Sequence, residues 1–165
     1  MNPPLVSVIM SVYNGEKYLV QAIESILNQT YQNFEFIIIE DCSTDNSLDI
    51  LEEYAKKDSR IKIIKKEKNI GIKGFIKNLN LGISIAKGKY IARMDADDIS
   101  LPERFQKQVI FLENNPKISM VGAQIDFINE KNEIIGEKTG ALEHEEIVKK
   151  MTSQIQLFHP VIMFR

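Results

Sequence analysis

The sequence has one cysteine, no tryptophan and no long apolar segment. Cys42 has no second cysteine to pair with, which excludes an internal disulfide and a zinc site built from several thiolates. No apolar run reaches the roughly 18 residues that a membrane-spanning helix needs. Neither sign of charge dominates, because 21 Lys and Arg accompany 23 Asp and Glu, and the formal net charge is −2. A basic protein that coats nucleic acid is therefore not expected.

What the sequence does contain is a regular alternation of two hydrophobic patterns. Runs rich in β-branched residues, typical of buried strands, occupy residues 5–12, 34–39, 61–64 and 90–94. Apolar residues at helical spacing predict helices over residues 16–27, 48–55, 76–86 and 105–112. Gly71 and Gly74 mark a loop, and Ser100–Glu103 is typical of a capping box at the start of the last of these helices.

After residue 117 the pattern changes to short strands. Residues 118–129 predict a strand pair or one long bent strand, followed by a turn at 131–133, a short helix over 143–151 and a strand over 161–164. The whole order predicts an α/β fold with a Rossmann-like, mostly parallel central sheet and helices on both faces. Ligands of such sheets bind beyond the carboxyl ends of the strands. We therefore expect the loops 12–16, 40–46 and 95–100 to converge at one edge.

The loop after the fourth predicted strand is strongly acidic, with Asp95, Asp97 and Asp98 close together. Neighbouring carboxylates repel one another unless a cation or hydrogen-bond donors compensate for their charge. Mg²⁺ and Mn²⁺ suit such oxygen ligands, and Mg²⁺ typically combines one or two carboxylates with phosphate oxygens and water. This favours a site that clamps a diphosphate. The alternative is that Asp98 caps the next helix while the other two are solvated.

The polar loop after the second predicted strand allows a competing interpretation. Counting Asp41 as position 1, oxygen-bearing side chains occur at positions 1, 3, 5, 7 and 9, with Glu52 at position 12, as in much of an EF-hand calcium loop. Against this, Asn46 replaces the glycine of that loop, and the preceding segment is typical of a strand rather than a helix. Asp41 at a strand end is well placed to accept a hydrogen bond from a base N–H. A weaker alternative is an RNA-binding GXXG loop at residues 71–74, which the negative net charge disfavours.

Taken in order, several motifs resemble those of family 2 glycosyltransferases. The segment Val6–Asn14, with Glu16, Tyr18-Leu19, Ala22-Ile23, Ser25-Ile26 and Gln29-Thr30, resembles the opening of that family. Glu40-Asp41 with Ser43-Thr44-Asp45 resembles the second motif. Later motifs are resembled by Asn69-Ile70-Gly71, residues 79–92, Asp95-Ala96-Asp97-Asp98, Arg104-Phe105, Gln108 and His159-Pro160-Val161. Each motif alone is weakly specific, but the ordered set spans nearly the whole chain.

The resemblance implies a GT-A fold (the nucleotide-diphospho-sugar transferase fold), a nucleotide-diphosphate sugar donor, expected to be a UDP-sugar, and a Mg²⁺ or Mn²⁺ cofactor. It implies a nucleotide-sugar site made of Val12, Tyr13, Asn14, Glu16, Asp41, Asn69, Asp95 and Ala96. In this assignment the backbone around residues 12–14 and Glu16 cradles the base and the ribose. Asp41 binds the uracil edge, Asp95 holds the ribose, and Asp97 ligates the metal.

The resemblance also implies inverting transfer to a glycan or lipid-linked acceptor in bacterial polysaccharide synthesis, with a carboxylate as general base. The family's base follows the His-Pro segment, so we expect it beyond Arg165 and interpret residues 1–165 as a single GT-A domain truncated at its C-terminal end. The expected setting is the cytoplasm, with peripheral contact at the inner face of the plasma membrane. The alternative is a non-catalytic nucleotide- or calcium-binding domain.

Overall fold

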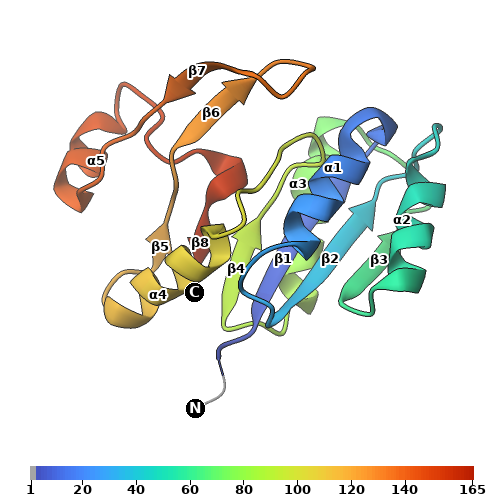
Figure 1. The fold of residues 1–165 in the computed structure, drawn as a ribbon, viewed down its shortest axis with the longest axis horizontal. Coiled ribbons are helices and arrows are strands. Elements are labelled where there is room, and N and C mark those ends of the chain that lie inside the picture. The colour runs from blue at the N-terminus through green and yellow to red at the C-terminus, as the bar shows by residue number, and fades with distance from the viewer. Residues whose placement is uncertain (1–2) are drawn as a thin grey trace.

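A six-stranded, mostly parallel sheet forms the centre of the computed structural model, which describes residues 3–165 (Figure 1). Its strands are β1 (Val6–Val12), β2 (Phe34–Glu40), β3 (Ile61–Lys65), β4 (Tyr90–Arg93), β5 (Met120–Val121) and β8 (Met163–Phe164). They lie in the order β3-β2-β1-β4-β8-β5. The first four are parallel, and β8 is antiparallel to both of its neighbours. The predicted fold class is confirmed; Met1 and Asn2 of the predicted domain lie outside the described residues.

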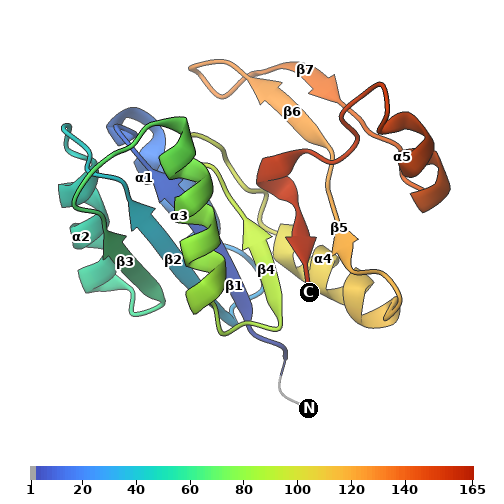
Figure 2. The ribbon, with the colours of Figure 1, turned by 180° about the vertical axis from the view of Figure 1, so that it is seen from behind.

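Helices cover both faces of this sheet, as predicted. α1 (Glu16–Leu27), α2 (Ser47–Lys57) and α4 (Arg104–Asn114) lie on one face, and α3 (Ile72–Ile85) lies on the other (Figures 1 and 2). The short α5 (His144–Lys150) and the 3-10 helix η1 (His159–Val161) belong to the C-terminal part. Among residues 3–165, no helix combines the length and the apolar composition that a membrane crossing requires.

The alternation of side chains along β1 explains this layering. Val6, Val8 and Met10 are buried in the main core, which they share with apolar residues of α1, α2 and α4. Ile9 points the other way, towards α3, because successive side chains of a strand face opposite sides of the sheet. α3 can lie close to the sheet because Gly82 has no side chain. A Cβ added there would be only 2.6 Å from Ile9 Cγ2. A larger residue at position 82 would therefore push α3 away from the sheet.

Three local predictions are wrong. Gly74 does not lie in a loop, because α3 begins at Ile72 and includes it. Ser100 starts no capping box: α4 begins at Arg104 without a side-chain cap, and the Ser100 hydroxyl accepts a hydrogen bond from Gln29 Nε2 at 3.1 Å. Residues 118–129 form neither a strand pair nor one bent strand. β5 joins the main sheet, whereas β6 (Ile125–Ile128) pairs with β7 (Ile134–Lys138).

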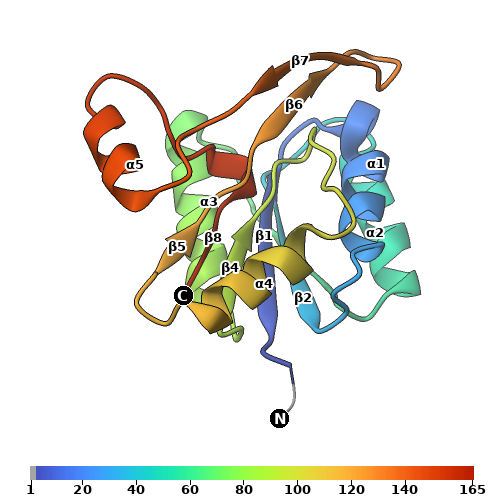
Figure 3. The ribbon, with the colours of Figure 1, turned by 60° about the vertical axis from the view of Figure 1, so that its left-hand side comes forward.

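β6 and β7 form a hairpin that leaves the main sheet and runs above its upper end (Figure 3). The predicted turn joins the two strands, and within it Asn132 has a φ of 61°. Lys17 Nζ lies 2.6 Å from Glu130 Oε1, which connects this turn to the first turn of α1. Because α1 follows the end of β1, the hairpin lies on the side of the sheet where the parallel strands end.

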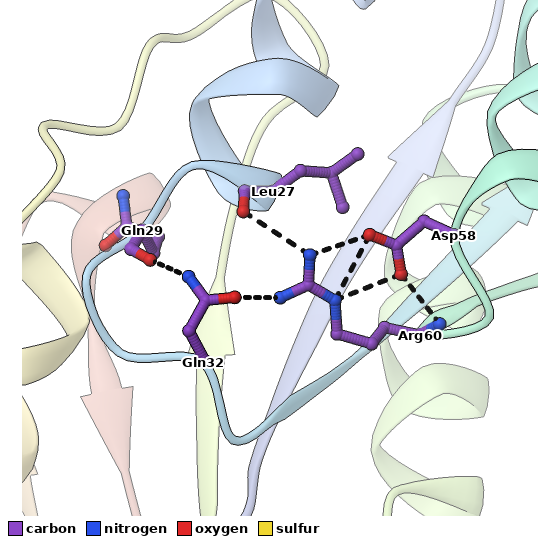
Figure 4. Close-up of polar contacts among 5 residues, drawn as sticks. All are labelled: Leu27, Gln29, Gln32, Asp58 and Arg60. Atoms are coloured by element: carbon purple, nitrogen blue, oxygen red, sulfur yellow. Dashed lines mark hydrogen bonds and ion pairs between the residues drawn. The ribbon is translucent and has the colours of Figure 1, made fainter.

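At the opposite edge, where the parallel strands begin, a polar network surrounds Arg60 (Figure 4). The guanidinium carbon lies 4.2 Å from the centre of the Phe34 ring, and Nη2 lies 2.6 Å from Asp58 Oδ2. Nε also donates to Asp58, Nη1 donates to Gln32 Oε1 at 2.8 Å, and Nη2 donates to the Leu27 carbonyl oxygen at 3.4 Å. Every nitrogen of this guanidinium has a partner. The network therefore ties the segment before β2 to the loop before β3.

Candidate functional site

The loop after β1 and the loop after β2 are joined by reciprocal hydrogen bonds. Asn14 N donates to Ser43 Oγ at 3.1 Å, and Thr44 N donates to Asn14 Oδ1 at 2.8 Å. Asn14 has a φ of 50°, in the left-handed region that Asn tolerates better than most residues. Val12 is fully buried at the end of β1, whereas the Tyr13 ring is half exposed. The predicted cradle around residues 12–14 is thus a loop whose backbone is fixed by its neighbour.

Glu16 contributes to the same junction. Glu16 N donates to Asp45 Oδ2 at 3.0 Å, and Glu16 Oε2 accepts hydrogen bonds from both Asn46 N, at 2.9 Å, and Asn46 Nδ2, at 2.7 Å. Asp45 Oδ1 also accepts from Ser47 N at 2.9 Å. Each of the two loops therefore caps the helix that follows the other one. In this structure the Glu16 carboxylate braces the loop after β2.

This bonding contradicts the calcium-loop interpretation. A strand, β2, precedes Asp41 where an EF-hand has a helix. The Asp45 carboxylate and the Ser43 hydroxyl accept hydrogen bonds from backbone N–H groups, as shown above. Glu52, the residue expected at the last ligand position, forms an ion pair with Lys65. The side-chain oxygens of Ser43, Asp45 and Glu52 are therefore already engaged in hydrogen bonds or an ion pair.

Asp41 lies just past the end of β2, with its carboxylate buried beside the start of α3. Asn69 Nδ2 donates to Asp41 Oδ2 at 3.0 Å, and a Cβ added to Gly74 would lie 3.3 Å from the same oxygen. Asp41 Oδ1 is buried and has no hydrogen-bond partner among residues 3–165. An unpaired buried oxygen is costly, and natural proteins keep few of them. This atom is therefore an acceptor available to a donor group on a ligand.

Asn69 shapes the approach to this acceptor from the other side. Its Oδ1 accepts a hydrogen bond from Gly71 N at 2.7 Å while its Nδ2 binds Asp41. Gly71 has φ 67° and ψ −152°, a conformation that only glycine adopts readily. The two predicted site residues Asp41 and Asn69 are thus in direct contact, and the GXXG segment serves as the entry to α3.

The acidic loop lies beside the loop after β1. The Ala96 methyl would be 3.7 Å from a Cβ built on Gly15, so the three loops converge as predicted. Asp97 is exposed, and Asp95 is half-buried with its Oδ1 2.6 Å from Arg93 Nη1. The end of β4 therefore presents one carboxylate to solvent and holds another against a buried guanidinium.

The crowding of negative charge in this loop affects the pKa of Asp98. Burial, together with the negative charges of Asp95 and Asp97, raises the pKa of Asp98 to about 6. It caps no helix, because α4 begins later, at Arg104. Such an excess of negative charge fits a divalent cation. No group of three or more acidic, His or Cys side chains within residues 3–165 forms a complete metal cage, so a cation here would take further oxygens from its ligand.

Two buried arginines beneath the acidic loop were not predicted as part of the site. Arg93 is 4% exposed, and its guanidinium carbon lies 5.1 Å from the centre of the Phe75 ring. Arg104 donates to the carbonyl oxygens of Arg93, at 3.0 Å, and Pro160, at 3.2 Å. Burial lowers the pKa of Arg104 to about 10, so it stays charged at neutral pH. The signal in the sequence was a charged residue within the apolar run 90–94, directly before three aspartates.

η1 brings a histidine to the same end of the sheet. The His159 ring lies 6.5 Å from the Phe75 ring, centre to centre. Burial and the positive charge of Arg93 lower the pKa of His159, while the charge of Asp95 acts in the opposite direction. His159 therefore lies close to Arg93 and Asp95; its His-Pro segment was among the motifs recognised in the sequence, but no role was predicted for its side chain.

Comparisons of sequence point to one family of proteins. The profile described as "Glycosyl transferase family 2" matches residues 7–164. An uncharacterized glycosyltransferase of Haemophilus influenzae is 46% identical over 161 residues, which cover 96% of this chain and 49% of the relative. The O-antigen biosynthesis glycosyltransferase WbnJ of Escherichia coli is 40% identical over 164 residues, covering 98% and 61%. The chain spans about half the length of the curated relatives that it matches.

A comparison of structures agrees with the sequence. Residues 1–349 of S. aureus TarS, crystallised in complex with UDP-GlcNAc, superpose with a TM-score of 0.62 at 32% identity. The superposition covers 67% of this chain and 32% of the TarS chain. Together with the family match, this likeness confirms the GT-A fold that the sequence motifs implied.

Proposed function

Because the chain belongs to glycosyl transferase family 2, we propose that it forms the donor-binding part of an inverting, metal-dependent glycosyltransferase that uses a UDP-sugar. The acceptor in this proposal is a glycan or a lipid-linked glycan. The E. coli relative is named for O-antigen biosynthesis, which supports an acceptor of the polysaccharide class. A lipid-linked acceptor would bring the protein to the inner face of the plasma membrane from the cytoplasm.

The observation that carries the proposal is the buried, unpartnered Oδ1 of Asp41 at the converging loops. The edge of uracil presents an N–H donor that would satisfy this oxygen, while Asn69 holds the other carboxylate oxygen in place. The TarS fragment was crystallised with a uridine nucleotide sugar, which supports uridine as the base. In the proposal, the backbone of Val12, Tyr13 and Asn14 cradles the base and ribose.

The remaining contacts follow the order of the loops. Glu16 keeps the first loop in register with the second, and Asp95 and the Ala96 backbone hold the ribose and diphosphate side of the donor. Asp97, exposed at the turn of the acidic loop, would hold Mg²⁺ or Mn²⁺. Such an ion, when bound, acts as a Lewis acid that stabilises negative charge on the departing diphosphate. Inversion requires a base that takes the proton of the acceptor hydroxyl, and we assign none of the residues 1–165 to that role.

The proposal is tested by thermal unfolding with UDP and MnCl₂. Binding to the native state alone stabilises it by mass action, so saturating UDP with Mn²⁺ should raise the melting temperature by about 5 °C. Asp97→Asn should abolish the part of the shift that depends on Mn²⁺. Glu53→Gln is the matched control, because this exposed carboxylate on α2 forms an ion pair with Lys57 one helical turn away. If UDP leaves the wild-type melting temperature unchanged both with Mg²⁺ and with Mn²⁺, the proposal fails.

A further inference from the structure

Arg93, buried at the end of β4, holds a carboxylate at the edge of the candidate site. Its Nη1 donates to the Met94 carbonyl oxygen at 2.6 Å and lies 2.6 Å from Asp95 Oδ1. The flat face of the guanidinium rests near the Phe75 ring of α3, on the far side of the sheet from α4. Arg104 in turn binds the Arg93 carbonyl oxygen. Arg93 is therefore fixed from three directions, and within residues 3–165 Asp95 is the carboxylate with which it forms an ion pair.

Most of the hydrogen-bonding capacity of this arginine remains unused. Arg93 Nε and Nη2 are buried and have no partner among the described residues. Each unpaired buried donor is costly and calls for an explanation, and Arg104 Nε is a further such atom among the described residues. Unpaired buried atoms beside a carboxylate at the end of a strand are candidates for a functional role. The geometry therefore favours a role in the site over a role in the core.

The charge around Asp95 explains why such a role would be needed. Asp95 stands two and three residues from Asp97 and Asp98, and its negative charge is one cause of the raised pKa of Asp98. Without a counter-charge, mutual repulsion would turn the Asp95 carboxylate towards solvent. Asp97 and Asp98 have no comparable ion pair within residues 3–165.

We propose that Arg93 is a positioning residue for donor binding: it holds the Asp95 carboxylate in the orientation that receives the nucleotide, and it acts through Asp95 rather than by touching the nucleotide. This inference rests on the proposed function, because it requires that Asp95 contacts the donor. Arginine suits the task because one planar group reaches a carbonyl and a carboxylate while its carbon lies over an aromatic ring.

The test is a double-mutant cycle on the affinity for UDP, measured by calorimetry with MnCl₂ present. Arg93→Met should weaken UDP binding by about tenfold when Asp95 is present. In the Asp95→Asn background the same change should weaken binding by less than about twofold, because the group through which Arg93 acts is gone. Arg93→Lys should restore part of the lost affinity, since the ammonium keeps the positive charge but lacks the planar arrangement of several N–H donors. If Arg93→Met does not fold, Arg93→Lys carries the same cycle.

Arg60→Met is the matched control, because Arg60 forms a similar aspartate pair over a phenylalanine at the other edge of the sheet. It should lower the melting temperature and leave the UDP affinity unchanged. Equal losses from Arg93→Met in both backgrounds would overturn the inference and leave the proposed function standing. If wild-type protein does not bind UDP at all, the proposed function and this inference fall together.

Discussion

Two arginine–aspartate pairs, each beside a phenylalanine ring, stand at opposite edges of the same sheet. Arg60 pairs with Asp58 over Phe34 where the parallel strands begin (Figure 4), and Arg93 pairs with Asp95 near Phe75 where they end. Both ion pairs have the same shortest N–O distance, 2.6 Å. They differ in what surrounds them. Every guanidinium nitrogen of Arg60 is bonded, whereas Arg93 leaves Nε and Nη2 without a partner among residues 3–165.

The difference separates a structural pair from a pair prepared for a ligand. At the edge where the strands begin, polar groups are matched to one another, and the network stabilises the connection between two loops. At the edge where the strands end, an Asp41 oxygen, two Arg93 nitrogens and Arg104 Nε are buried and have no hydrogen-bond partner among residues 3–165. Natural proteins keep few such atoms, and a functional role is one reason for which they are kept. The same residue types therefore stabilise the fold at one edge and, on our proposal, bind a donor at the other.

The largest loss of stability is expected from removing the Arg104 side chain, which binds carbonyl oxygens at the end of the parallel strands. Arg104→Met leaves the buried carbonyl oxygen of Arg93 and the partly buried one of Pro160 without the hydrogen bonds that Arg104 donates. Each unsatisfied buried acceptor costs about 1–3 kcal/mol, so we expect a total loss of about 3 kcal/mol after relief of the buried charge. Chemical denaturation measures it. Gln106→Met, an exposed change on the same helix, is the control, and equal stabilities would show that the arginine anchors nothing.

A smaller loss is expected at the other edge from Asp58→Asn. The hydrogen bonds from Arg60 hold the pKa of Asp58 below its usual value of 3.8. A lowered native pKa means that the stabilisation is present above the unfolded value and is lost as the pH falls through the native one. We expect a loss of about 1 kcal/mol at neutral pH, since the pair is partly exposed. The difference from wild type should shrink below about pH 4, and UDP binding should not change.

Asp98→Asn should raise the stability of the protein at neutral pH, whereas Asp58→Asn should lower it. Burial and the charges of Asp95 and Asp97 raise the pKa of Asp98 to about 6, so ionised Asp98 destabilises the native state at neutral pH. A raised native pKa means that stability is greatest below the unfolded pKa and is lost as the pH rises through about 6. After a discount for solvent screening, Asp98→Asn should add about 1 kcal/mol at pH values near 8.

The pH dependence of this gain sharpens the comparison between the two edges. The stabilisation by Asp98→Asn should vanish as the pH approaches about 4, where Asp98 itself is protonated. Thermal unfolding of the wild type and both variants over a pH series gives the slope, against pH, of each variant's difference in stability from wild type. Slopes of the same sign for Asp58→Asn and Asp98→Asn would contradict the distinction drawn between a satisfied and an unsatisfied edge.

The sequence predicted what depends on local periodicity and missed what depends on distant partners. β1 and α1 follow from the spacing of their own apolar residues, and the three loops follow from the ends of strands. The position of Ser100 could not be predicted, because Gln29, far along the chain, competes for its hydroxyl. The same holds for residues 118–129, since the strand that pairs with Met120 lies at residue 164.

The candidate site shows the same division. Asp41, Asn69 and Ala96 were predicted from motifs, and the structure brings each of them to the loops at the end of the parallel strands. The role of Arg93 was not predicted, because its environment is built from Phe75 of α3 and Arg104 of α4, which only the folded chain brings together. The available signal was the charged Arg93 inside an apolar strand. Which of its nitrogens find a hydrogen-bond partner could be seen only in the folded structure.

The smallest change in stability is expected from Gly74→Ala, which should nevertheless weaken UDP binding. Alanine favours a helix interior by about 1 kcal/mol over glycine. The added Cβ would lie 3.0 Å from Ile70 Cγ1 and 3.3 Å from Asp41 Oδ2, so the crowding offsets that gain and the net change should stay within about 0.5 kcal/mol. Displacing the Asp41 carboxylate should weaken UDP binding several-fold. Gly136→Ala is the control, because its Cβ would meet Phe127 at an ordinary 3.6 Å within the hairpin. An unchanged UDP affinity in Gly74→Ala would show that the buried Asp41 oxygen is not the acceptor for the base.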